Sequence, residues 1–244
     1  MEILGIDIGG TGIKGAIVNT QKGTLITERY RVLTPNPATP EAVSKIIYNF
    51  TKHFQWNGPI GCGFPSVVQK DIVKTASNID KSWVNINLAE LISRVTSCKT
   101  KVINDADAAG IAEMKFGSGK GNKDVVIMIT VGTGIGSAIF TNGKLFPNTE
   151  FGQIIFRGDI AEKYISGKIK KDQNLSWKKW SFRFNEYIEY IEKLIYPDMI
   201  IIGGGLCKKS EKFIEYISAN SKIEIAQLRN NAGIIGAAMY AETK

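Results

Sequence analysis

The chain has 244 residues, 43% of them hydrophobic, and carries 31 Lys and Arg against 23 Asp and Glu. That length and hydrophobic content suit two compact lobes with a core each, and the basic balance attracts polyanions such as nucleotides, polyphosphate or nucleic acid. No signature of an RNA- or DNA-binding domain accompanies the lysines, no apolar run approaches membrane-spanning length, and the three cysteines include no CxxC pair. These features argue against a membrane protein, a disulfide framework and a cysteine metal site, so we expect free thiols and a cytoplasmic location.

The N-terminal stretch over 5–18, GIDIGGTGIKGAIV, predicts a β-hairpin with a glycine-rich tip. A backbone without Cβ atoms approaches an anion closely and aims successive N–H groups at it, so this tip suits phosphate oxygens. Asp7 comes where the first strand ends and is placed to hold a hydrated Mg²⁺ there. The strand-like run after the glycines argues against the Rossmann turn, and a tight turn in an ordinary sheet is the alternative.

The segments that follow alternate between strand and helix. The proline-rich stretch TPNPATP leads into a helix start at Thr39 and Pro40. A buried strand over 59–64 is followed by polar residues, among them Asn78, which are candidates for contact with a hydroxylated ligand or for a turn. The elements expected before residue 104 are strands over 24–31, 59–64 and 101–103, and helices over 39–54 and 88–95.

Asn104 and Asp105 mark the turn from the strand over 101–103 into a helix of small residues. One polar residue at such a turn is typical of an N-cap, but together with Asp107 three of them crowd this one, which favours a ligand site. A carboxylate held against a substrate hydroxyl takes its proton as the oxygen attacks phosphorus. Asp105 is therefore the predicted general base.

A second copy of the hairpin lies at 129–145, with the sequence ITVGTGIGSAIFTNGKL. It aligns with the first so that Gly132 pairs with Gly9 and, after a one-residue gap, Thr133 pairs with Thr11. Two copies so far apart in the chain indicate two similar lobes rather than a solenoid. We expect the two hairpins to hold a phosphate chain between them.

The remaining segments predict a linker, two helices and a third glycine turn. The stretch over 116–122, FGSGKGN, is predicted to be a loose linker near the hinge between the lobes, and Glu150 is expected to be a solvated loop residue. An aromatic helix over 176–192 is assigned to core or dimer contacts. A strand, three glycines and a helix over 199–213 suit a phosphate or nucleotide, and a small-residue helix over 231–241 is able to pack on the first lobe.

Motifs along nearly the whole chain share the patterns of one known family. They are DIGGTGIKGAIV, TPNPATPE, NDADAAGIAE, TVGTGIGSAIF, LFPNTEFG, LSWKKW, PDMIIIGGG and NNAGIIGAAM. In this combination the chain resembles the polyphosphate glucokinases, a branch of the ROK (repressor, open reading frame, kinase) sugar kinases in the actin-like and hexokinase clan. The TPNPATP segment and the double tryptophan single out the polyphosphate branch.

The resemblance implies an α/β fold of two actin-like lobes that close over a cleft and exclude water as a competing acceptor. The N-terminal lobe is expected over 1–104 and the C-terminal lobe over 105–230, with a final helix over 231–244 that packs on the first lobe. It also implies a homodimer with no nucleic-acid or membrane partner. The implied enzyme moves a terminal phosphoryl group from polyphosphate, or ATP, to the 6-hydroxyl of glucose or a related sugar with Mg²⁺.

By motif, the resemblance assigns roles to individual residues. Asp7 would belong to the Mg²⁺ and phosphate site, and Asp105 would be both the general base and a sugar ligand. The residues implied to bind phosphate or nucleotide are Gly9, Gly10, Thr11, Gly12, Lys14, Thr133, Gly134, Gly203, Gly204 and Gly205. The residues implied to bind the sugar are Asn78, Asn104, Asp105, Glu150 and Gln153.

The sugar-binding motif departs from the family pattern at two positions. Gln153 replaces the His of the family's ExGH, and Ile155 stands where this branch usually has a Glu. Gln still donates and accepts hydrogen bonds, but Ile cannot replace a carboxylate, so the acceptor is open between glucose and another sugar or polyol. The family's cysteine zinc motif is absent, and we expect no zinc. The alternatives are an ATP-dependent kinase for a different sugar or polyol and a sugar- or phosphate-binding sensor with weak turnover, against which the intact Asp105 argues.

Overall fold

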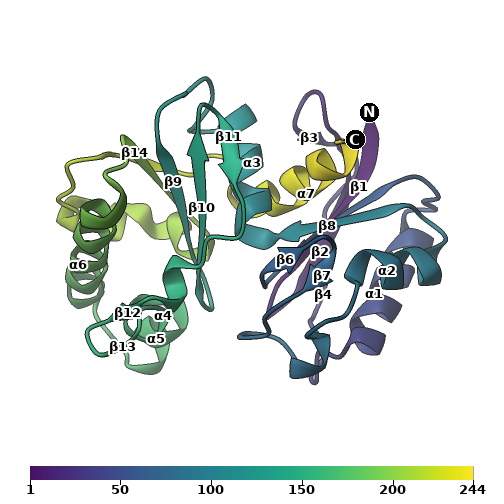
Figure 1. The fold of residues 1–244 in the computed structure, drawn as a ribbon, viewed down its shortest axis with the longest axis horizontal. Coiled ribbons are helices and arrows are strands. Elements are labelled where there is room, and N and C mark those ends of the chain that lie inside the picture. The colour runs from purple at the N-terminus through teal and green to yellow at the C-terminus, as the bar shows by residue number, and fades with distance from the viewer. Residues whose placement is uncertain (244) are drawn as a thin grey trace. The chain divides into compact units, whose positions relative to one another are not determined.

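Two mixed β-sheets organise the computed structural model, which describes residues 1–243 (Figure 1). One compact unit contains Met1–Ala112 together with the segment from Asn231 onward, and the other contains Glu113–Asn230. We call them unit 1 and unit 2. The division falls inside helix α3 (Asp105–Phe116), whereas the lobe boundary expected from the sequence lies at the start of that helix.

The sheet of unit 1 has the strand order β3-β2-β1-β5-β8, and β4 also pairs with β2. β1 and β2 form the antiparallel hairpin that the glycine pattern predicts, and β1, β5 and β8 run parallel. β6 and β7 form a separate two-stranded ribbon. The strands are β1 Glu2–Ile8, β2 Ile13–Asn19, β3 Thr24–Leu25, β4 Tyr30–Val32, β5 Ile60–Phe64, β6 Val68–Gln69, β7 Ile72–Val73 and β8 Thr100–Asn104.

The alternation of side chains along β1 gives the two faces of this sheet to different helices. Leu4, Ile6 and Ile8 are fully buried in the core that includes residues of α1 and α2. Gly5 faces the other way, and a Cβ built on it would lie 2.1 Å from the carbonyl oxygen of Ile234 in α7. The C-terminal helix therefore packs on this sheet with backbone close to backbone. The helices of unit 1 are α1 Pro40–His53, α2 Leu88–Thr96, the first part of α3, α7 Ala232–Glu242 and a 3₁₀ turn at Lys81–Trp83.

In unit 1 the structure confirms the predicted helix start at Thr39 and contradicts the predicted strand over 24–31. The helix start at Thr39 is confirmed, because its hydroxyl accepts the Ala42 N–H at 3.3 Å and Pro40 follows it. The single strand expected over 24–31 is wrong, since β3 and β4 are separate. The Thr27 hydroxyl accepts the Ile17 N–H at 3.0 Å, so a side chain takes the place of a strand carbonyl and interrupts the ladder.

The sheet of unit 2 repeats the order of the first, as β11-β10-β9-β14-β15. β9 and β10 form the second antiparallel hairpin, and β9, β14 and β15 run parallel. The duplication inferred from the sequence therefore extends from the hairpins to the whole sheet. The strands are β9 Val126–Val131, β10 Ile135–Thr141, β11 Lys144–Phe146, β12 Ile155–Phe156, β13 Asp159–Ile160, β14 Met199–Gly203 and β15 Lys222–Ile225.

The long aromatic helix of unit 2 supplies core residues. Trp180, Phe184 and Tyr187 of α6 are fully buried in one cluster with strand residues of β9 and β14. The Trp180 indole donates to the Ile165 carbonyl at 2.7 Å, which gives this buried ring its polar partner. The helices of unit 2 are α4 Glu162–Ile165, α5 Gly167–Asp172, α6 Trp177–Ile195 and the 3₁₀ segments Phe151–Gln153, Gly205–Lys212 and Ile214–Tyr216.

The loose linker expected over 116–122 is instead an ordered turn built on Glu113. The buried Glu113 carboxylate accepts the Ser118 N–H at 3.0 Å, and Gly117 and Gly119 donate to the Glu113 carbonyl. The same carboxylate accepts the N–H groups of Gln227 and Leu228 at 3.2 and 2.7 Å. Because a buried carboxylate needs such donors, this turn is fixed by hydrogen bonds rather than left flexible.

Candidate functional site

The end of the first hairpin carries an ion pair. Asp7 on β1 lies opposite Lys14 on β2, and Lys14 Nζ is 3.0 Å from Asp7 Oδ2. Gly233, near the start of α7, packs on the same carboxyl, since a Cβ built there would lie 3.1 Å from the Asp7 Cγ. The loop itself closes with the Gly9 N–H donating to the Gly12 carbonyl at 3.2 Å. Two groups assigned to the phosphate and metal site, Asp7 and Lys14, are thus in direct contact.

Asp7 and Asp105 lie on the same face of the unit 1 sheet. Asp7 pairs with Gly63 of the neighbouring strand β5. A Cβ built on Gly63 would lie 3.5 Å from the Asp105 Cα and 3.6 Å from the Ala108 Cβ. The start of α3 at Asp105 therefore packs over Gly63, on the strand next to that of Asp7.

Asn104 is the cap of α3. Its Oδ1 accepts the N–H groups of Ala106 and Asp107 at 2.8 and 3.1 Å, and its Nδ2 donates to the Ser66 carbonyl at 3.1 Å. The alternative interpretation of this turn, an N-cap, is correct for Asn104. The cap is not Asp105, which is the first residue of the helix and half-buried. Asn104 has a second amide hydrogen for a ligand, because the bond to Ser66 uses only one.

Asn78 lies in an exposed connection beside the tip of the first hairpin. A Cβ built on Gly10 would lie 3.7 Å from the Asn78 carbonyl oxygen. The structure thus brings Asn78 next to the phosphate loop.

The second hairpin has acidic neighbours that the sequence did not reveal. Its loop closes with the Gly132 N–H donating to the Gly134 carbonyl at 3.0 Å. The next residue, Ile135, donates its N–H to Glu162 Oε2 at 3.3 Å. Glu162 stands nine residues beyond Gln153 in no recognisable motif, so no signal in a single sequence marked it.

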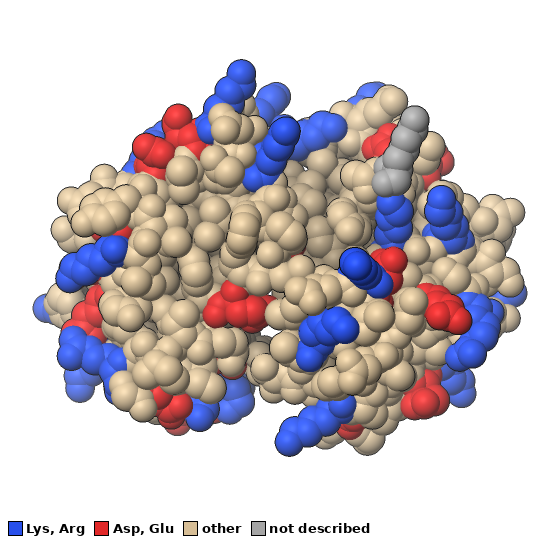
Figure 2. Space-filling model, in the orientation of Figure 1, with Lys and Arg blue, Asp and Glu red and all other residues tan. Residues whose placement is uncertain are grey.

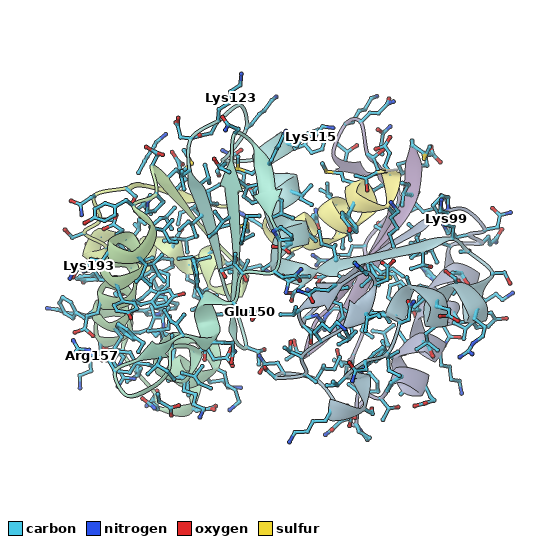
Figure 3. All side chains as sticks on the ribbon, in the orientation of Figure 1. Lys99, Lys115, Lys123, Glu150, Arg157 and Lys193 are labelled. Carbon is cyan, nitrogen blue, oxygen red and sulfur yellow. The ribbon has the colours of Figure 1, made fainter. Side chains whose placement is uncertain are left out.

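Glu150 is not the solvated loop residue expected. Burial, and then the negative charge of Glu162, raise the pKa of the Glu150 carboxyl to about 7. The turn that follows is pressed onto β10, since a Cβ built on Gly152 would lie 2.2 Å from the Ile135 carbonyl oxygen. Figure 3 shows Glu150 beside the loop end of the hairpin β9–β10. Two carboxylates, Glu150 and Glu162, therefore stand together at this hairpin.

Ile155 occupies a different part of unit 2. Its side chain is 68% exposed and lines a surface hollow with Arg157, Glu186, Tyr190 and Lys193. Arg157 and Lys193 lie on the α6 side of the unit, away from Glu150 (Figure 3). The carboxylate near Glu150 is instead that of Glu162, which comes from α4.

The third glycine turn lies against the second hairpin. Gly204 has φ of +85°, and a Cβ built on it would lie 2.5 Å from the Val131 carbonyl oxygen. The helix expected after it is wrong: Gly205–Lys212 is a 3₁₀ segment interrupted at Lys209, where φ is −125°. The turn therefore packs on the end of β9 at Val131, but without the regular helix N-terminus that would add a dipole.

Comparison with known proteins identifies the family. Residues 3–155 match the sequence profile of the ROK family. The chain is 43% identical over 96% of its length to a polyphosphate glucokinase of Mycobacterium tuberculosis, of which it covers 89%. This chain belongs to the ROK family. Its fold is the actin-like, hexokinase-type α/β fold of the ROK sugar kinases, with the hairpin-first sheet present in both units.

Solved ROK structures superpose closely on this chain. A crystal structure of an inorganic polyphosphate/ATP-glucomannokinase from Arthrobacter sp. strain KM is 41% identical and has a TM-score of 0.96, with 98% of each chain covered. A ROK family glucokinase from Streptomyces griseus, 24% identical with a TM-score of 0.87 and 99% of each chain covered, supports the fold alone. Among the described residues, no helix is long and apolar enough to span a membrane.

Proposed function

We propose that this chain is a sugar kinase that transfers a terminal phosphoryl group from inorganic polyphosphate, and also from ATP, to the 6-hydroxyl of glucose or a related sugar. The observation that carries the proposal is the placement of Asp105 over Gly63, which pairs with Asp7 of the Asp7–Lys14 pair in the glycine hairpin. The names of relatives that are more than 40% identical over nearly the whole chain support the choice of donor and acceptor.

In this proposal Asp105 takes the proton of the sugar hydroxyl as its oxygen attacks phosphorus. The N–H groups of Gly10, Thr11 and Gly12 and the Lys14 ammonium bind donor oxygens. In unit 2 the backbone at Thr133, Gly134 and the turn Gly203–Gly205 binds phosphate or nucleotide. Asn78, Asn104, Glu150 and Gln153 bind sugar hydroxyls, and we add Glu162, because it stands beside Glu150.

The residues present fit a magnesium ion that is held mainly by the donor. No cluster of three or more His, Cys, Asp or Glu that could cage a metal occurs among residues 1–243. Mg²⁺ is commonly held by one or two carboxylates, waters and substrate phosphates, and needs no protein cage. One Asp7 oxygen accepts from Lys14, and the other carries lone pairs for a magnesium-bound water. Magnesium would neutralise charge on the transferred phosphoryl group.

The homodimer and the cytoplasmic location inferred from the resemblance stay predictions. Sedimentation of the purified chain over a range of concentrations tests the first.

A coupled assay that crosses polyphosphate and ATP with a panel of sugars tests the proposed function. We expect sugar 6-phosphate from both donors, with glucose among the acceptors. Transfer from neither donor to any sugar, with sugar binding retained, would contradict the proposal and favour the sensor.

Asp105→Asn tests the base directly. We expect kcat to fall by roughly 10²- to 10⁴-fold, as for loss of a general base, while the dissociation constant of the sugar changes only a few-fold. Asp124→Asn, in the exposed turn before β9, is the matched control and should keep full activity. Retention of most activity in Asp105→Asn would remove Asp105 as the base.

A further inference from the structure

Arg31 lies at the first phosphate hairpin and takes no part in the chemistry described above. On the sheet, Arg31 of β4 is opposite Lys14 of β2, and Lys14 is opposite Asp7 of β1. Residues directly opposite each other on neighbouring strands project from the same face. Asp7, Lys14 and Arg31 therefore form a row across three strands.

The Arg31 side chain packs against the glycine loop at the tip of the first hairpin. Its Nη2 donates to the Thr11 carbonyl at 3.2 Å. A Cβ built on Gly12 would lie 2.7 Å from the Arg31 Nε, so the guanidinium lies flat against a position that only glycine leaves open. On the other side of the loop the Thr34 hydroxyl donates to the Gly9 carbonyl at 2.5 Å. Two loop carbonyls are thus covered by donors from the segment 31–34, and an anion approaching the loop meets N–H groups instead of these oxygens.

The charge of Arg31 is available to a ligand. Lys14 is paired with Asp7, but none of the ion pairs formed by residues 1–243 involves Arg31. A guanidinium has five N–H donors, and the hydrogen bond to Thr11 uses one of them. The residue is exposed. On the face shown in Figure 2, Lys and Arg side chains are scattered among Asp and Glu.

The residues of the row that contains Asp7, Lys14 and Arg31 follow a fixed order across the sheet. Asp105 stands at one end, followed by Gly63, Asp7, Lys14 and, on the outermost of these strands, Arg31. The phosphoryl group being transferred must lie near Asp105 and Asp7. Arg31, at the far end, is positioned for a phosphate further along the donor.

We propose that Arg31 is a donor-binding residue that favours polyphosphate over ATP. The inference rests on the proposed function and names a determinant of its donor. Polyphosphate repeats its negative charge at every unit, whereas the charge of ATP ends after three phosphates. The planar guanidinium pairs with phosphate oxygens through two parallel hydrogen bonds, so an extra contact at the far end of the row benefits the longer anion.

Calorimetric titration of the full chain with medium-chain polyphosphate, without sugar, tests the binding. Arg31→Gln should weaken binding roughly ten- to hundredfold, as expected for loss of charge-assisted hydrogen bonds. The affinity for ATP should change less than about threefold, since its charge is confined to the near end of the row. Arg29→Gln is the matched control: it removes the same charge two residues earlier, where Arg29 is 3.5 Å from Asn231 Oδ1, and should leave polyphosphate binding within about twofold.

Arg31→Lys separates a ligand contact from a structural role. Lysine keeps the charge, so it should recover part of the lost affinity, and the salt dependence of binding should be shallower in Arg31→Gln than in Arg31→Lys. Equal losses in Arg31→Lys and Arg31→Gln, or in Arg29→Gln and Arg31→Gln, would overturn the inference. Melting temperatures of all variants show whether each is folded.

Measurement of the donor KM separates failure of this inference from failure of the proposed function. If wild-type protein transfers phosphate from polyphosphate and Arg31→Gln leaves the donor KM unchanged, the inference about Arg31 is wrong and the proposed function stands. If wild-type protein transfers no phosphate from any donor, the proposed function is wrong, and the calorimetric comparison still decides whether Arg31 binds the anion.

Discussion

The two glycine hairpins share a backbone and differ in the side chains around it. Each closes with one N–H to carbonyl bond across its tip, from Gly9 to Gly12 in the first and from Gly132 to Gly134 in the second. Each continues into a sheet of the same strand order. At the cross-strand position where the first has Asp7 opposite Lys14, the second has Thr130 opposite Gly136.

Their neighbours are of opposite charge. The side chains of Arg31 and Thr34 donate hydrogen bonds to carbonyls of the first loop. Just after the second loop, the Ile135 N–H donates to Glu162, and Gly152 packs against the Ile135 carbonyl. A repeated backbone can thus keep the shape of an anion loop while its two copies take on different chemistry. The first copy carries a lysine, Lys14, next to its loop, whereas the second has the carboxylates Glu150 and Glu162 beside it.

Among changes to the two hairpins, the largest expected effect comes from Asp7→Asn, which removes the carboxylate that the first hairpin has where the second has Thr130. We expect kcat/KM to fall roughly hundredfold or more, the scale for loss of a charged transition-state group. Steady-state kinetics at saturating Mg²⁺ measure it. Thr130→Val at the equivalent position of the second hairpin is the control, with activity within about threefold. Similar losses in both variants would mean that the two hairpins do the same chemistry.

A smaller effect comes from the way the second hairpin is supported. Gly152→Ala places a Cβ 2.2 Å from the Ile135 carbonyl oxygen, a backbone atom that cannot move aside cheaply. We expect unfolding to become easier by about 1–3 kcal/mol, the usual cost of overpacking, as measured by urea denaturation.

Gly132→Ala is the matched control for that change, because a Cβ at Gly132 meets nothing within 4 Å. It should change the free energy of unfolding by less than about 0.5 kcal/mol. If Gly152→Ala is equally neutral, the turn 150–153 does not support the hairpin.

The smallest expected effect is a shift of a pH profile. Burial and the charge of Glu162 together hold the pKa of Glu150 at about 7, so in Glu162→Gln the repulsion is lost and that pKa falls toward its ordinary value. If ionised Glu150 accepts a hydrogen bond from a sugar hydroxyl, kcat/KM for the sugar declines below about pH 7 in the wild type. In Glu162→Gln the midpoint of this decline moves to lower pH. Glu186→Gln changes a half-buried carboxylate that pairs with Arg157, and it should leave the midpoint in place. A midpoint that is the same in all three proteins would show that Glu150 is not the group titrating.

Local patterns predicted the elements and the duplication because those features depend on neighbours in the sequence. The apolar run of Ile3, Leu4, Ile6 and Ile8 marks a buried strand, and Thr39 before Pro40 marks a helix start. The matched glycines of 5–18 and 129–145 indicated two similar lobes before any fold was known. Each of these signals spans fewer than about twenty residues.

The rest could not be predicted, because it depends on contacts between distant segments. Arg31 reaches Thr11 only because β4 folds back onto β2, and Glu162 reaches Ile135 only because α4 lies beside β10. Glu150 resembles any loop carboxylate in sequence, and its raised pKa arises from burial. The candidate site was predicted best where a motif is continuous in the chain and worst where a single side chain arrives from elsewhere.

Glu113 has a consequence for how the chain is assembled. Its carboxylate joins the N–H of Ser118, soon after the chain enters unit 2, to those of Gln227 and Leu228, just before the chain leaves it. The two ends of unit 2 are therefore held side by side by one carboxylate. Loss of the Glu113 side chain would release the entering and the leaving segment of unit 2 at the same time.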